Sequence, residues 1–175
     1  ISGFKSNILS LSFLIFICSF LIGSAQTPGE WTFMGGNTPG MFGVQGVPSP
    51  ANHPPGLYEP CEWKDKNGNF WLFGGGLGGG ASASLWKFDP NPSSPTYNQW
   101  TWMKGPSAIN QNGVYGTQGI PAAANYPGAR GFGAATWVDA SGNFWLFGGA
   151  GYGAAGGLNN LNDLWKYDPN PASPT

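Results

Sequence analysis

The chain has 175 residues, of which only 9% are charged, and a formal net charge of −1. This near-neutral balance gives no support for nucleic acid or an anionic membrane surface as a partner. Glycine (30 residues) and proline (16 residues) are abundant, yet nine tryptophans and twelve phenylalanines supply enough apolar area for a core, which argues against disorder.

Residues 1–25 are predicted to be a secretory signal peptide. Lys5 precedes an apolar run at residues 8–22, and residues 23–25 (Gly-Ser-Ala) are small, as a signal peptidase requires. A membrane anchor is the alternative interpretation, but a run of about 15 residues is short for a spanning helix. We therefore expect an exported mature chain, residues 26–175, with no stable membrane insertion after cleavage.

An eight-residue stretch occurs twice. Residues 68–75 read GNFWLFGG, and residues 142–149 repeat all eight letters at an offset of 74 (142 − 68). An apolar strand that ends in a glycine pair and returns later in the chain indicates a repeat architecture. Aromatic residues favour strands and the flanking residues favour turns, so strands are expected at 70–73 and 144–147. Both faces of these strands are apolar, which predicts cover on both sides.

Three further segments recur around this core strand, and each predicts another strand. Before the core strand, the pattern W-x-D-x-x-G-N begins at Trp63 and at Trp137, and its Asp and Gly predict a hairpin turn. Pro60 cannot donate to a ladder, so the first of these strands is expected to be short or irregular. With the strands of one unit named a to d, the predicted order is 31–34 (d), 57–63 (a), 70–73 (b), 85–90 (c), 100–103 (d), 131–137 (a), 144–147 (b) and 164–169 (c).

Repeated units of four antiparallel strands are typical of β-propeller blades. The order d, abcd, abc divides the chain into units at about 31–99 and 100–175. Two blades cannot close a ring, and each would leave an apolar face uncovered. The sequence therefore predicts an all-β fragment of a larger propeller, in which missing blades cover those faces and the first strand d completes the last blade.

The connections between strands also carry a pattern. Residues 40–48 resemble residues 113–121, and Asn-His-Pro at 52–54 matches Asn-Tyr-Pro at 125–127. Because the Gly and aromatic positions recur, we expect these long loops to be ordered. The glycine-rich run at 74–80 is expected to be a simple b–c connection with positive φ angles, since no Lys or Ser/Thr follows it as a phosphate-binding loop would require.

The second unit contains four spaced motifs: P-G-x-R at 127–130, W-x-D at 137–139, the repeated octapeptide, and L-N-D-L-W-x-Y at 161–167. Together they resemble the kelch repeat, in the long form seen in secreted bacterial proteins related to the galactose oxidase central domain. The first unit departs from this pattern, because Ser84 stands where the second unit has Asp163.

The resemblance implies a propeller, and kelch propellers are mostly binding or scaffolding modules. We therefore expect a bacterial protein that is secreted or lies at the cell surface or in the periplasm, with a non-catalytic binding or structural role. The expected partners are the missing blades of the same chain and a protein or a glycan.

A copper radical oxidase is the enzyme that the resemblance includes, and its metal needs His and Tyr ligands and a Tyr joined to a Cys. After the signal peptide the chain has one histidine, His53, and one cysteine, Cys61. We expect no catalytic residue, no metal ligand and no cofactor in this chain. Cys61 is interpreted as a small buried residue, because no second cysteine remains to pair with it. A secreted oxidase or glycan-active enzyme with catalytic residues elsewhere stays an alternative.

The recurring residues are predicted to hold the repeat together, with the tryptophans packed between blades and Arg130 in a structural ion pair or backbone contacts. They are Gly74, Gly75, Gly148, Gly149, Trp71, Trp145, Trp86, Trp165, Trp102, Arg130 and Asp139. Aromatic residues in the loops are the candidates for contact with a ligand, since sugars stack on such rings: Phe42, Tyr115, Tyr126 and Tyr152. A glycan-binding module is therefore a further alternative.

Overall fold

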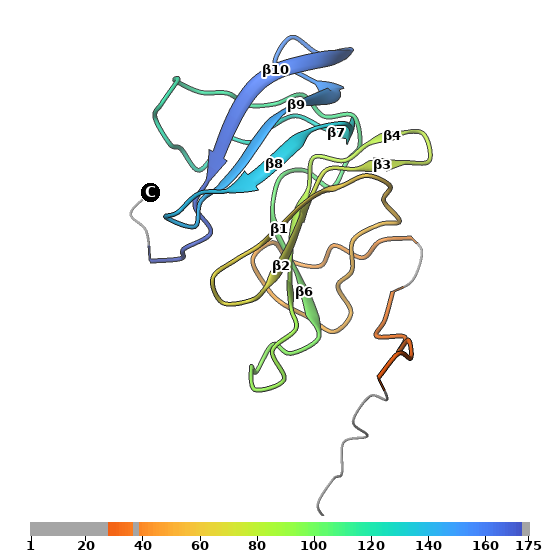
Figure 1. Cartoon of the computed structure of the whole chain (residues 1–175). Helices are drawn as coiled ribbons and strands as arrows, with labels where there is room; N and C mark the ends of the chain where they lie inside the picture. The colour runs from red at the N-terminus through yellow and green to blue at the C-terminus, as the bar shows by residue number, and fades with distance from the viewer. Residues whose placement is uncertain (1–27, 37–38, 173–175) are drawn as a thin grey trace, which may run out of the picture. The chain divides into compact units, whose positions relative to one another are not determined.

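A computed structural model describes residues 28–36 and 39–172 (Figure 1). The predicted signal peptide lies outside these residues. The chain divides into two units, Ile1–Phe33 and Met34–Thr175, and the described part of the first unit contains no strand. In the part of the chain that the structure describes, no helix is long and apolar enough to cross a membrane.

The unit from Met34 onward is all-β, and every strand pair in it is antiparallel. Sheet 1 has the order β1 (Cys61–Lys64), β2 (Phe70–Phe73), β5 (Leu85–Asp89), β6 (Gln99–Lys104). Sheet 2 has the order β10 (Leu158–Tyr167), β9 (Phe144–Tyr152), β7 (Arg130–Phe132), and β8 (Ala135–Val138) also pairs with β9 (Figure 1). A small separate pair consists of β3 (Gly76–Leu77) and β4 (Gly80–Ala81). The prediction of repeated four-stranded antiparallel sheets is confirmed.

A hairpin built on one aspartate begins each sheet. In sheet 1 the Asp65 carboxylate accepts bonds from the backbone N–H groups of Asn67 and Asn69, and from the Trp71 indole at 2.9 Å. The carboxylate therefore fixes the turn and the first inward-facing ring of β2 together.

The second hairpin repeats this arrangement. Asp139 accepts bonds from the backbone and side-chain amides of Asn143 and from the Trp145 indole, each at 2.9 Å. The side-chain bonds from Asn143 and then Trp145 hold the pKa of Asp139 well below its ordinary value. The structural role predicted for the W-x-D motif is thus observed in both units.

The core lies between the two sheets. Trp71 and Phe73 of β2 are 2% and 4% exposed, and they face Phe144 and Leu146 of β9, which are 2% and 3% exposed. The rings of Trp71 and Phe144 meet edge to face, with centroids 5.3 Å apart. Trp63 stacks on Phe144 at 5.4 Å and donates its indole N–H to the Trp145 carbonyl. Aromatic packing of this kind stabilises a sheet-on-sheet interface.

Among the described residues, each core strand is buried on one face only, as expected for two units without further neighbours, and cover of the second face by other units stays a prediction. On the outer face of sheet 1, Phe70 is 45% exposed, and on the outer face of sheet 2, Phe147 is also 45% exposed. The reason is the number of layers: the described residues form two packed sheets, so neither outer face has a third sheet against it. Trp145 lies on this outer face of sheet 2, half-buried beside Trp137.

The predicted strand d at residues 31–34 is wrong, because residues 31–36 form no strand. A strand requires a neighbour for its backbone groups, and Met34 instead accepts a bond from the Asn98 side chain. The other strand d is present and slightly longer than predicted, as β6. The first strand a is short, as predicted: it begins only at Cys61, after Glu59 with a φ of 49° and Pro60.

Three further elements differ from the prediction. The glycine run at 74–80 does have positive φ at Gly74, Gly75 and Gly79, but it also contributes the β3–β4 hairpin. The second strand a is divided into β7 and β8. β9 continues beyond the glycine pair to Tyr152, because β10 pairs with it along its length and a register shift between Leu161 and Leu164 accommodates the glycines.

Candidate functional site

Polar side chains converge in sheet 2 around Asp163. Its Oδ2 atom accepts bonds from Arg130 Nη2 at 2.5 Å, from the Tyr115 hydroxyl at 2.5 Å and from the Trp165 indole at 2.8 Å. Arg130 is 1% exposed, and neither its Nε and Nη1 atoms nor Asp163 Oδ1 has a partner among the described residues. The ion pair predicted for Arg130 is therefore present, and it rests on a single N–H···O contact.

The backbone of Arg130 also links sheet 2 to the connection between β2 and β5. Its carbonyl accepts the N–H of Gly75, and its own N–H donates to the Ser82 carbonyl, with N···O distances of 2.8 and 3.0 Å. Tyr115 belongs to the long loop before β7, so its hydroxyl attaches that loop to β10 through Asp163. The cluster thus joins one loop, two strands and the neighbouring repeat.

The surroundings of Asp163 and Tyr115 determine their protonation states. Burial opposes ionisation of Asp163, but bonds from Tyr115 and Trp165 and the charge of Arg130 together hold its pKa below the ordinary value. Burial, and next the bond to Asp163, raises the pKa of Tyr115. Near neutral pH the carboxylate therefore stays ionised and the phenol stays protonated, so neither is poised to exchange a proton.

In the first repeat, the equivalent tryptophan is held by a neutral hydroxyl instead of a carboxylate. The Trp86 indole donates to Ser84 Oγ at 2.9 Å, where Trp165 donates to Asp163 in the second repeat. Phe42 packs on Trp86 at 5.0 Å, much as Tyr115 packs on Trp165 at 4.8 Å. The first repeat therefore forms the equivalent corner without an ion pair.

The loop aromatics named from the sequence have different surroundings. Phe42 lies against Trp86 and Trp102, and Tyr115 is bonded to Asp163, so both attach loops to the sheets. Tyr152 packs against the hydrophobic core. Tyr126 lines a surface groove.

The two long loops are held by the same device, and their predicted order is confirmed. The side-chain amide of Asn52 donates to the Val47 carbonyl at 2.9 Å, and that of Asn125 donates to the Ile120 carbonyl at 3.2 Å. Gly43 and Gly116 have φ angles of 64° and 59°, and a Cβ at either would collide with the Oδ1 atom of its Asn. The recurring Gly and Asn residues therefore preserve loop shape.

A groove of about 340 Å³ lies between these loops. It is lined by Gln45, Lys104, Gly105, Pro106, Ala123, Ala124 and Tyr126, and we call it the loop groove. Lys104 Nζ donates to the Ala123 carbonyl at 2.7 Å, and Gln45 Nε2 donates to the Gly105 carbonyl at 3.4 Å. Lys104 and Gln45 were not identified from the sequence. Lys104 belongs to no recurring motif, and Gln45, which recurs as Gln118, stands in a loop whose repeat indicated only that the loop is ordered.

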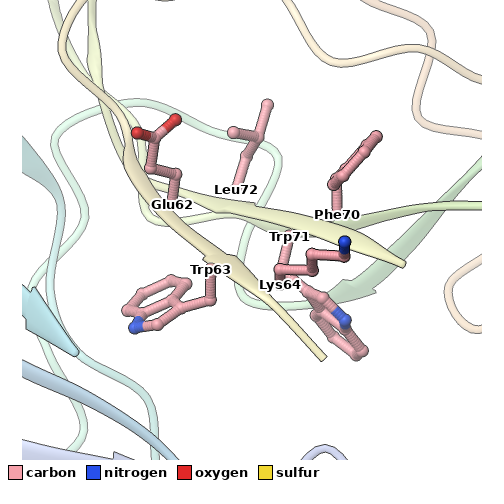
Figure 2. A pocket seen from close by; sticks show the side chains of 6 residues that line it. All are labelled: Glu62, Trp63, Lys64, Phe70, Trp71 and Leu72. Atoms are coloured by element: carbon pink, nitrogen blue, oxygen red, sulfur yellow. The ribbon is translucent and has the colours of Figure 1, made fainter. Parts of the chain in front are cut away.

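A second hollow, of about 360 Å³, follows the β1–β2 hairpin. Figure 2 shows its lining residues on both faces of the hairpin: Glu62 and Leu72 point one way, and Trp63 and Trp71 the other. Because polar groups do not converge there, this hollow is a depression beside a sheet face rather than a binding site.

Cys61 and His53 lie apart from any reactive arrangement. Burial raises the pKa of the Cys61 thiol to about 12, against the opposing charge of Arg130, so the thiol is protonated and a poor nucleophile. His53 is half-buried, and its backbone forms a bridge with Met41. Within residues 28–36 and 39–172, no group of three or more His, Cys, Asp or Glu side chains could hold a metal ion.

Comparison with models of known families, with curated proteins and with solved structures found no match. The chain is an all-β protein with antiparallel sheets.

Proposed function

We propose that the chain is part of a larger kelch-type β-propeller, exported from a bacterial cell, with a non-catalytic binding or structural role. The observation that carries this proposal is the head-to-tail contact between the two repeats. Trp71 and Phe73 of the first unit pack against Phe144 and Leu146 of the second. By the sequence repeat, Phe144 and Leu146 correspond to Phe70 and Leu72. One face of each unit therefore meets the opposite face of the next.

A head-to-tail contact leaves one copy of each face open. Sheet 2 exposes Trp137, Phe147 and Leu164 at 44%, 45% and 55%, on the face equivalent to the buried face of sheet 1. Such contacts continue from unit to unit until a ring closes. Further units with the same Phe-x-Leu face would cover this surface, and this supports the propeller.

The surroundings of the acidic side chains support a non-catalytic role. Asp65 and Asp139 hold hairpin turns, and Asp163 accepts three bonds in a buried cluster. Asp89 accepts bonds from Thr96 Oγ1 and the Asn91 backbone, and Asp168 accepts the equivalent backbone bond. These carboxylates therefore accept hydrogen bonds that hold turns and loops in place.

Metal analysis of the full-length exported protein tests the role. The proposal predicts no stoichiometric copper in protein purified from its native host. One copper per chain, with oxidation of an alcohol by the purified protein, would contradict it and would favour the secreted oxidase alternative.

A second candidate function, glycan binding, is favoured by one observation. Tyr126 lines the loop groove together with Lys104 and Gln45, and aromatic rings can support sugar rings. Titration of the full-length protein with a broad sugar panel, followed by calorimetry, tests this function; heats no larger than dilution for every sugar would contradict it.

A further inference from the structure

The loop groove has a definite charge and shape. We propose that it binds an acidic saccharide, with the Lys104 ammonium pairing with a uronic acid carboxylate and the Tyr126 ring supporting the sugar. This inference rests on the proposed binding role and adds the class of ligand.

The charge comes from Lys104. It is the one charged residue among those lining the groove, and its hydrogen bond goes to a neutral carbonyl, that of Ala123. An ammonium has three hydrogens, so two remain for a ligand. Among the described residues the ion pair is Arg130–Asp163, and Lys104 has no carboxylate partner. Burial lowers the pKa of Lys104, and a carboxylate would compensate for the hydration that burial removes.

The shape comes from small residues and one aromatic ring. Gly105, Ala123 and Ala124 line the groove without bulky side chains, so a flat ring can approach. The backbone of Tyr126 exchanges two hydrogen bonds with Val114, each 3.0 Å long, which fixes the backbone that carries this side chain. Backbone that is ordered before binding reduces the entropy lost when a ligand binds.

Polar groups beside the ring suit hydroxyl groups. Gln45 uses its Nε2 atom to reach the Gly105 carbonyl, and its side-chain carbonyl remains an acceptor. A sugar acid presents a carboxylate, hydroxyl groups and an apolar ring face together. A peptide C-terminus presents a carboxylate and a side chain, and the small lining residues offer no deep pocket for that side chain.

The repeat provides an independent argument. The two long loops share the residues that hold their shape, Asn52 with Asn125 and Gly43 with Gly116. Tyr126, in contrast, stands where the first loop has His53, and both loops are ordered. The ring of Tyr126 is therefore not a requirement of the loop fold and is available for a ligand.

Calorimetry with trigalacturonic acid and with its fully methyl-esterified form tests the inference on the full-length protein. We expect the acid to bind about tenfold more tightly than the ester, the effect of one charge-assisted hydrogen bond. Lys104→Met should remove this difference and Tyr126→Ala should weaken binding of both forms. Lys87→Met, on β5 and outside the groove, should match the parent.

Equal affinity for acid and ester, or an unchanged difference in Lys104→Met, would overturn the carboxylate assignment. If Tyr126→Ala still weakened both forms, the binding role would stand while this inference failed. A free-carboxylate tripeptide that bound more tightly than the trisaccharide, in a Lys104-dependent way, would overturn the saccharide class. Failure of the proposed function has its own signal, stoichiometric copper and turnover, which these titrations do not measure.

Discussion

Trp71 and Trp145 are equivalent in the repeat but differ in burial, and this difference gives a quantitative prediction. Both indoles donate to the aspartate of their hairpin at 2.9 Å. Trp71 is 2% exposed between the sheets, whereas Trp145 is half-buried on the outer face of sheet 2. Replacing each by Ala removes the same hydrogen bond, so the two substitutions differ mainly in packing.

The packing terms can be estimated from burial. Trp71→Ala deletes a fully buried ring and leaves a cavity, which costs about 3–5 kcal/mol. Trp145→Ala loses roughly half of the transfer free energy and leaves no enclosed cavity, so about 1–2 kcal/mol is expected. At about 2–4 °C per kcal/mol for a chain of this size, Trp71→Ala should lower the melting temperature by about 6–20 °C.

Urea unfolding of the 26–175 chain, followed by far-UV circular dichroism, measures both free energies. Trp71→Phe serves as a milder variant if Trp71→Ala does not fold. Equal losses for Trp71→Ala and Trp145→Ala would refute the assignment of the buried and outer faces. In a longer chain that carries further repeats, the loss for Trp145→Ala should rise toward that for Trp71→Ala.

Three further predictions concern single side chains. The folded pKa of Asp139 is depressed, so its contribution to stability is present above the unfolded pKa of about 3.9 and is lost as pH falls. Asp139→Ala should therefore flatten the dependence of the melting temperature on pH in the acid range. An unchanged dependence would contradict this. Cys61, whose thiol pKa is raised to about 12 by burial, should react with a thiol reagent at pH 8 only after urea is added, and fast labelling of the native protein would disprove its burial. Arg130→Met should cost about 3–5 kcal/mol by leaving Asp163 without its cation, and Arg130→Met with Asp163→Asn should recover part of that loss in urea unfolding; strictly additive losses would show that the pair is not coupled.

The sequence was most informative where structure is local. β2 has the predicted bounds, because a short aromatic run between turn-forming residues has few alternatives as a strand. The hairpin at Asp139 was also predictable, since the aspartate and its donors lie within a few residues.

Long-range pairing was not predictable in the same way. The length of β9 depends on its pairing with β10 beyond the glycine pair, which no local pattern encodes. The exposure of Phe70 and Phe147 has a similar origin, because an apolar face in a sequence does not say which chain segment will cover it.

The candidate site was predictable only in part. Tyr126 was one of four loop aromatics with equal sequence support, and only the geometry separated it from Tyr115 and Phe42, which attach their loops to the sheets. Lys104 and Gln45 come from segments far apart in the chain, so their convergence required the fold.

A crystal structure of the full-length exported protein is the most direct test of the central claim, that these sheets are successive units of a closed propeller. The account predicts that the outer face of β8–β9–β10, with Trp145 and Phe147, is covered by the Phe-x-Leu face of another four-stranded unit. An outer face that is open to solvent, or covered by a segment of another architecture, would contradict it.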